Sequence, residues 1–185
     1  MGRQADPEAR DGASSGSKPL PLVHDIYSFA YLPAKFLTGQ YQHQLQDIVA
    51  YITDDRYRAL PIGYGYIWPL ANRGVCYGCG WSLELPDLDS ADPHRQRIII
   101  QRMELLARFP GARHSSWFRQ GLQLLEAYRT EQGTYCFPPT YLVEQRSGYY
   151  IGGNYMGLED NRRNPKALEL ESTFRMLLIQ QQPAI

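Results

Sequence analysis

The feature that most constrains the fold is an internal repeat, because the second half of the sequence matches the first at a constant offset. The aligned pairs are Pro33 with Pro110, Leu45 with Leu122, Gln46 with Gln123, Ala50 with Ala127, Tyr51 with Tyr128, Thr53 with Thr130, Pro61 with Pro138 and Tyr64 with Tyr141. After a short deletion the match continues with Gly74 and Gly148, Gly78 and Gly152, and Trp81 and Tyr155. Since chance matches are rarer at Pro, Gly and Tyr than at Leu, we interpret the chain as two diverged copies of one unit.

Both copies combine helical and extended segments in the same order. Apolar residues recur at helical spacing in the segments 24–37, 41–53, 92–109, 115–128 and from about 164 to 178. Pro33 is expected to kink or split the first helix, Asp92 and Pro93 to begin the third, and Ser115 or Ser116 to cap the fourth. Short Gly-broken aromatic segments, 63–68 with 75–81 and 134–142 with 149–151, predict two hairpins.

This order of elements predicts a mainly α fold of tandem helix-helix-hairpin repeats. We expect a partial α/α toroid of about five helices with two short β-hairpins. Residues 1–21 are expected to be a disordered tail and residues 22–182 a single repeat domain, with copies at about 22–100 and 101–182. A closed ring needs more helices than these, so self-association, an unconventional closure, or toroid helices from a partner or a longer chain would have to cover the open flanks.

Charge and composition exclude several classes of protein. Lys plus Arg and Asp plus Glu number 19 each, and no basic stripe is visible, so we expect no nucleic acid partner. The sequence contains neither a secretory signal nor an apolar run long enough to span a membrane. With three cysteines and no disulfide framework, the expected location is cytoplasmic, without a membrane partner.

Several motifs resemble a known group of proteins. The segments are 60–65 (LPIGYG), 80–86 (GWSLELP), 133–138 (GTYCFP), 157–163 (GLEDNRR) and 169–176 (ELESTFRM). Over residues 22–180 they resemble a family of bacterial proteins of uncharacterised activity that is similar to the terpenoid cyclase and prenyltransferase toroids. The acidic motifs and the Gln-x-x-x-Gly-x-Trp repeat of those enzymes are missing here, and the acidic segment 87–92 is typical of a loop and helix cap. The resemblance therefore implies the toroid fold and no particular reaction.

The aromatic residues of the two predicted hairpins are candidates for a ligand pocket. They are Tyr64, Tyr66, Trp68 and Trp81 in the first copy and Tyr141, Tyr149, Tyr150 and Tyr155 in the second. Their ring faces and hydroxyl groups suit a sugar, an aromatic compound or an isoprenoid. The alternative, which the sequence favours, is that they pack the hairpins onto helix ends. The ligand-binding candidates are Tyr64, Tyr66, Trp81, Tyr141, Tyr149, Asn154, Tyr155 and Arg162.

Two acids are the candidate catalytic residues if the chain is an enzyme. Glu159 lies in a polar loop with Asp160, Arg162 and Arg163, and ordinary capping or ion pairing is the simpler interpretation there. Glu171 shares a helix face with apolar residues and needs a cationic partner, for which we considered Arg113, Arg162 and Arg175. A structural salt bridge is the simpler interpretation of Glu171 as well.

Cys76 and Cys79 form a C-x-x-C pair, but in a strand these two positions point to opposite faces. We therefore expect buried free thiols, with no metal and no cofactor. The sequence thus leads to a module that binds a small, partly apolar or carbohydrate ligand with its hairpin aromatics. The alternative is a non-enzymatic interaction protein that completes its helical ring by self-association.

Overall fold

A computed structural model of the chain describes residues 21–67, 77–90, 96–144, 148–158, 162 and 164–181. Within these residues the protein is mainly helical, with seven α-helices and one two-stranded antiparallel sheet. The mainly α class is therefore confirmed, whereas the expected number of about five helices is too low. The additional helices are single turns between Pro, Asp and Ser residues, and they are too short to show a hydrophobic period. Of the expected tail, residues 1–20 lie outside the described residues.

The first half of the chain contains a split helix and a long helix. Helix α1 (Val23–Ala30) ends before Pro33, and a 3-10 turn, η2 (Ala34–Phe36), follows that proline. The predicted split is confirmed, because Pro lacks the backbone N–H that a continuing helix needs. Helix α2 spans Gln40–Thr53, and Asp54 then caps helix α3 (Asp55–Arg58) by accepting from the backbone N–H of Arg56 at 2.8 Å.

The second half contains the same order of helix, short helical turn and helix. Helix α5 spans Ile99–Ala107, α6 spans Pro110–Arg113 and α7 spans Ser116–Glu126. Helix α5 stops before Pro110, and Pro110 is the first residue of α6, because proline is favoured at the first helical position. Ser115 caps α7 by accepting from the N–H of Phe118 at 3.2 Å, as predicted. The predicted helix start at Asp92 and Pro93 lies outside the described residues. The last described helix is α8 (Ala167–Gln181).

One of the two predicted hairpins is present. Strand β1 (Tyr64–Ile67) pairs antiparallel with β2 (Tyr77–Trp81), with Tyr64 opposite Trp81. The second prediction is wrong, because its described residues form two 3-10 turns, η3 (Pro139–Tyr141) and η4 (Tyr150–Gly152). The consecutive prolines at 138 and 139 have no N–H to donate to a ladder, and the ring of Tyr141 is buried in the core instead of lying on a sheet face.

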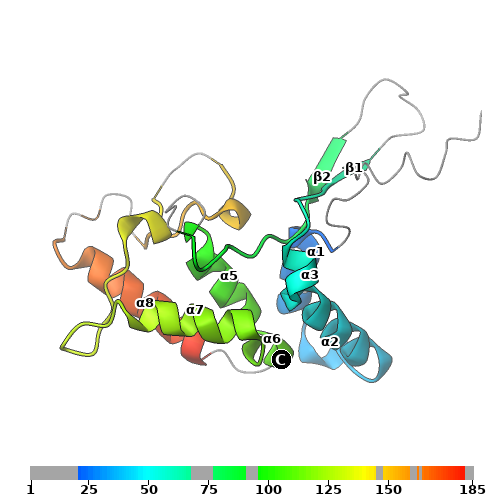
Figure 1. Cartoon of the computed structure of the whole chain (residues 1–185), viewed down its shortest axis with the longest axis horizontal. Coiled ribbons are helices and arrows are strands. Elements are labelled where there is room, and N and C mark those ends of the chain that lie inside the picture. Colours follow the sequence, from blue (N-terminus) through cyan, green and yellow to red (C-terminus); the bar gives the residue numbers. More distant parts are fainter. Residues whose placement is uncertain are drawn as a thin grey trace, which may run out of the picture.

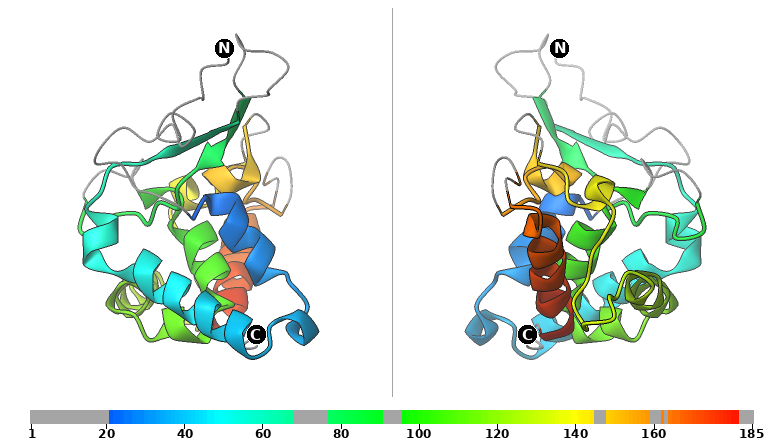
Figure 2. Two further views of the ribbon diagram at one scale, coloured as in Figure 1. Left: turned by 90° about the vertical axis from the view of Figure 1, so that its right-hand side faces the viewer. Right: turned by 90° about the vertical axis from the view of Figure 1, so that its left-hand side faces the viewer.

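The helices form a row with α5 at its centre (Figure 1). Helix α5 packs against α1 on one side and α8 on the other, and it also contacts α6 and α7. Helices α1, α2 and α3 lie at one end of the long axis and α8 at the opposite end, while the β1–β2 hairpin projects from the α1 end (Figures 1 and 2). The core gathers around α5, where Met103 and Leu106 are buried with Trp117 and Phe118 of α7.

Candidate functional site

A polar cleft of about 150 Å³ lies where four elements meet. Helix α1 contributes Tyr27 and Tyr31, α5 contributes Gln101, Glu104 and Arg108, the η4 turn contributes Tyr150, and α8 contributes Arg175. Such a convergence of titratable side chains from distant parts of the chain is the usual form of a small-molecule site. This cleft is therefore the candidate functional site.

An ion pair between α8 and α5 forms the wall of the cleft. The Nη1 atom of Arg175 lies 3.2 and 3.1 Å from the two carboxylate oxygens of Glu104, and its Nη2 donates to the carbonyl of Met156 at 2.7 Å. Both residues are buried. The Nε–H of Arg175 is buried too and has no hydrogen-bond partner among the described residues. A buried donor without an acceptor is costly, so this group favours an acceptor from outside the chain.

Beside this pair, Arg102 holds α5 to two loops. It is 1% exposed, and its Nε donates to the carbonyl of Glu84 at 2.8 Å while its Nη1 donates to the carbonyl of Ile151 at 3.1 Å. Nη1 also donates to the side-chain oxygen of Gln101, whose amide nitrogen donates to the carbonyl of Tyr150. Burial lowers the pKa of Arg102, with the nearby Tyr27 and Glu84 acting in the opposite sense. These hydrogen bonds of the guanidinium thus go to neutral oxygens, and they fix α5 to the segment before it and to the η4 turn.

Burial also changes the titration of the acid in the cleft. It raises the pKa of Glu104 to about 7, against the opposing effects of Arg175, the Tyr150 hydroxyl and Arg108. Burial likewise raises the pKa of Tyr27 and of Tyr150, so both hydroxyls stay protonated at neutral pH and can donate hydrogen bonds. At the rim, the guanidinium carbon of Arg108 lies 4.0 Å from the ring centre of Tyr31. Two guanidinium groups, Arg108 and Arg175, and one carboxyl, Glu104, leave the cleft with an excess of positive charge.

The aromatic residues predicted to line a pocket are spread over the molecule. Tyr64 and Tyr66 are exposed on β1, and Trp81 packs edge-on against His24 of α1 at 5.9 Å. Tyr141 is buried, and its hydroxyl donates to Gln96 at 2.6 Å. Tyr149 and Tyr155 are exposed, and Trp68 lies outside the described residues. Of all the hairpin aromatics considered, Tyr150 reaches the polar cleft.

Glu171 is part of a second ion-pair network. Its carboxylate accepts from the N–H of Leu158 at 3.0 Å and from Nε of Arg162 at 2.7 Å, and Nη1 of Arg162 lies 2.8 Å from Glu144. Arg162 is one of the three arginines considered as the partner of Glu171. These contacts connect the loop before α8 to α8 itself. A catalytic role of Glu171 stays a prediction.

One further predicted residue, Asn154, joins neither cluster. Asn154 is buried and donates from its side chain to the carbonyl of Tyr149 at 3.1 Å, which holds the turn after η4. Glu159 and Cys76, like the side chain of Cys79, lie outside the described residues.

The sequence analysis did not identify Glu104, Arg108 and Arg175 as residues of a functional site. The available signal was three polar residues, Gln101, Arg102 and Glu104, between the apolar runs Ile98–Ile100 and Leu105–Leu106 of one helical segment. Polar side chains in a helix that is apolar on every side must be satisfied internally, so such residues mark either a structural network or a site.

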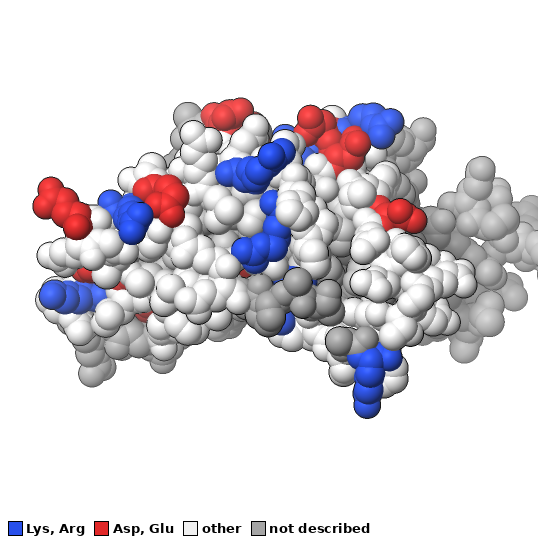
Figure 3. Space-filling model, turned by 90° about the horizontal axis from the view of Figure 1, so that it is seen from below, with Lys and Arg blue, Asp and Glu red and all other residues white. Residues whose placement is uncertain are grey.

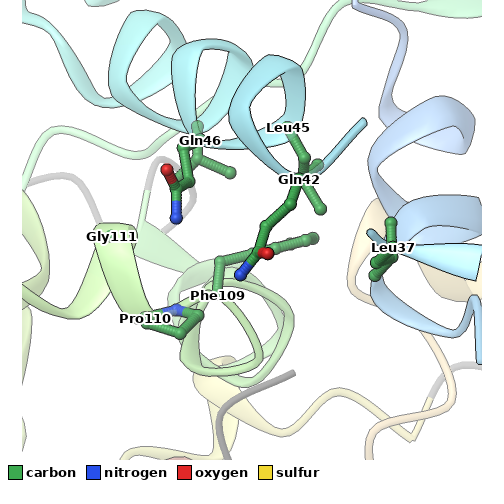
Figure 4. Close-up of a pocket in the computed structure, with 8 residues that line it drawn as sticks. Leu37, Gln42, Leu45, Gln46, Phe109, Pro110 and Gly111 are labelled. Carbon is green, nitrogen blue, oxygen red and sulfur yellow. The ribbon is translucent and has the colours of Figure 1, made fainter. Parts of the chain in front are cut away.

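A second hollow lies between α2 and α6 (Figure 4). Gln42 and Gln46 project from α2 toward Pro110 and Gly111, and the remaining lining is apolar (Figure 4). Its volume is about 70 Å³ and no charged side chain lines it. This hollow is a packing gap rather than a site, because it holds at most a few waters.

No protein-family model matches the sequence, and no curated protein or solved structure is significantly similar to the chain. Among the described helices, none combines the length and the apolar character needed to cross a bilayer. On the face seen from below, basic and acidic side chains are interspersed between wide uncharged areas (Figure 3).

Proposed function

We propose that the chain is a binding module for a small organic anion, a carboxylate attached to an apolar or aromatic group. The observation that carries this proposal is the buried Nε–H of Arg175, which lacks an acceptor among the described residues and belongs to a residue that lines the cleft. A ligand carboxylate supplies the missing acceptor, and charge-assisted hydrogen bonds to guanidinium are among the stronger ones.

The charge of the cleft favours an anion over a neutral ligand. Arg108 and Arg175 line the cleft with a single carboxyl, Glu104, whose pKa of about 7 leaves it partly protonated at neutral pH. The apolar part of the ligand would contact Leu105, Leu178 and the ring of Tyr31, which also line the cleft. The proposed ligand is small and partly apolar, like the one expected for the hairpin pocket. Its proposed site is instead the cleft between α1, α5, η4 and α8.

The volume of about 150 Å³ limits the ligand to a few carbon atoms or a single ring. Calorimetric titration with acetate, butyrate and benzoate, each compared with its amide, tests the proposal. We expect at least one acid to bind about tenfold more tightly than its amide, because the amide cannot neutralise the guanidinium groups. If no acid binds better than its amide, the proposal is wrong.

Two variants connect this binding to the cleft. Arg108→Gln removes a charge at the rim and should weaken binding of the acid, while Arg119→Gln removes an exposed charge on α7 and should leave the affinity unchanged. Equal losses in both variants would indicate nonspecific attraction to the surface.

For the architecture, we infer that the two halves are diverged copies of one unit and that the row of α1, α5 and α8 is an arc of an α/α toroid. The order α1, η2, α2 recurs as α5, α6, α7, which supports the duplication. Crystallography tests this inference: the pair α1 and α2 should superpose on the pair α5 and α7, and a clearly different crossing angle would contradict it.

A further inference from the structure

An apolar groove of about 460 Å³ lies at the α1 end of the molecule. It is lined by Phe29 of α1, by Leu32 and Phe36 from the segment that joins α1 to α2, and by Leu45 and Ile48 of α2. Tyr41, which also lines the groove, is 67% exposed and Phe36 is 54% exposed. Tyr41, Leu45 and Ile48 recur at positions i, i+4 and i+7, the spacing with which one helix packs against another.

An apolar ridge lies on α8 at the opposite end. Leu170, Phe174 and Leu177 are 59%, 42% and 43% exposed, and they recur at the same spacing of i, i+4 and i+7. The other side of α8 buries Met176 and Ile179 in the core. Helix α8 is thus apolar on two sides, and the chain covers one of them with α5.

We propose that the α8 ridge of one copy docks in the α1–η2–α2 groove of a second copy, so that copies of this chain associate head to tail. An amphipathic helix with anchors at i, i+4 and i+7 is the shape that an apolar groove between helices accepts. Within the chain α5 packs between α1 and α8, and an α8 helix docked beside α1 and α2 extends this row by one helix. The proposal is independent of the ligand in the polar cleft.

The positions of the two surfaces decide the kind of assembly. In Figure 2, α1 and α2 face the viewer in the view from one end of the long axis and α8 faces the viewer in the view from the other. Groove and ridge differ from each other, so the contact is heterologous and produces open chains or a closed ring of several copies. In a symmetric dimer each surface would pair with the same surface of the second copy, so the ridge would not lie in the groove.

Sedimentation velocity over a wide range of concentrations measures this association. The wild-type mass should rise from the monomer value of 21.2 kDa to that of several copies as concentration increases. Phe174→Glu on the ridge and Phe36→Glu in the groove should each raise the apparent dissociation constant at least about tenfold. Tyr64→Glu, on the exposed face of the hairpin, is the matched control and should associate like the wild type.

Mixing the two variants is the decisive measurement. Phe174→Glu keeps an intact groove and Phe36→Glu keeps an intact ridge, so a mixture should form a heterodimer and nothing larger. A monomeric wild type at all concentrations, or a mixture that forms no heterodimer, overturns the proposal. So does association that depends on Phe174 alone, which would indicate pairing of α8 with α8. Leu170→Glu and Tyr41→Glu repeat the test at a second pair of exposed positions, should either first variant fold poorly.

Discussion

Helices α5 and α2 show how differently one chain uses two helices of mixed composition. All nine residues of α5 are buried, whereas only Val49, Ile52 and Thr53 are buried among the 14 residues of α2. Helix α5 is surrounded by α1, α6, α7 and α8, while α2 contacts α3 and α6. The polar residues of α2 other than Thr53 therefore lie in solvent, whereas those of α5 have to find partners inside the protein.

That difference determines where the two candidate surfaces lie. Gln101 and Glu104 of α5 line the polar cleft, although every residue of this helix is largely removed from solvent. Apolar residues of α2 that no described helix covers line the groove together with residues of α1 and η2. The candidate ligand site thus contains buried polar residues, whereas the proposed docking surface contains exposed apolar ones.

The largest expected effect comes from removing the buried guanidinium of α5. Arg102→Ala leaves the carbonyls of Glu84 and Ile151 without these donors and leaves a cavity, so we expect the free energy of unfolding to fall by about 3 to 4 kcal/mol. Urea denaturation measures the loss. Arg119→Ala on the exposed face of α7 is the control and should unfold like the wild type. Equal stability of the two variants would show that burial of Arg102 contributes nothing.

A second effect depends on pH. Because the pKa of Glu104 is about 7 in the folded chain and near 4.5 when unfolded, the folded state binds more protons between these values. The free energy of unfolding should therefore decrease as the pH rises through this window, by about 2 to 3 kcal/mol for this group. Glu104→Gln should abolish that component in denaturation curves recorded across the window, while Glu131→Gln, at an exposed position, should retain it. A Glu104→Gln variant with the wild-type pH dependence would contradict the assignment.

Packing around α5 is also tighter than packing around α2. A Cβ atom at Gly121 of α7 would lie 2.6 Å from the sulfur of Met103, so Gly121→Ala should destabilise the protein by about 1 to 2 kcal/mol despite the better helix propensity of Ala. Thermal denaturation with and without Met103→Val tests the cause. If the clash is responsible, the added methyl group should be better tolerated beside Val than beside Met.

The smallest effect has the opposite sign and belongs to the α2 side. A Cβ atom at Gly111 of α6 would lie 3.8 Å from Val49, an ordinary contact. Gly111→Ala should therefore stabilise the protein by about 0.5 kcal/mol, because it restricts the unfolded chain without straining the folded one. A destabilised Gly111→Ala variant would show that the α2–α6 contact is as tightly packed as the surroundings of α5.

Local features of the fold were predictable because their causes are local. The interruption at Pro33, the cap at Ser115 and the hairpin ending at Trp81 each depend on residues within a few positions of one another. The predicted second hairpin failed for a related reason. Its aromatic pattern suits a strand, but the missing donors of Pro138 and Pro139 and the burial of Tyr141 outweigh that preference.

The candidate site was not predictable in the same way. Glu104 and Arg175 are 71 positions apart, and Gln101 meets the Tyr150 carbonyl across 49 positions. Periodicity indicates that α5 is buried on one side, but not that α1, α7 and α8 cover its remaining sides. For the same reason Tyr150 and Tyr149 look equivalent in the sequence, although the first lines the cleft and the second is in solvent.

The sequence by itself determined where helices begin and end, where the chain turns, and that the protein is mainly helical, because these depend on short-range hydrogen bonding and on missing N–H groups. The tertiary structure decided which polar residues are removed from water and which apolar residues stay exposed. Both outcomes depend on which helices cover which faces. Such contacts join residues far apart in the chain, and their free energy comes from burial rather than from local conformation.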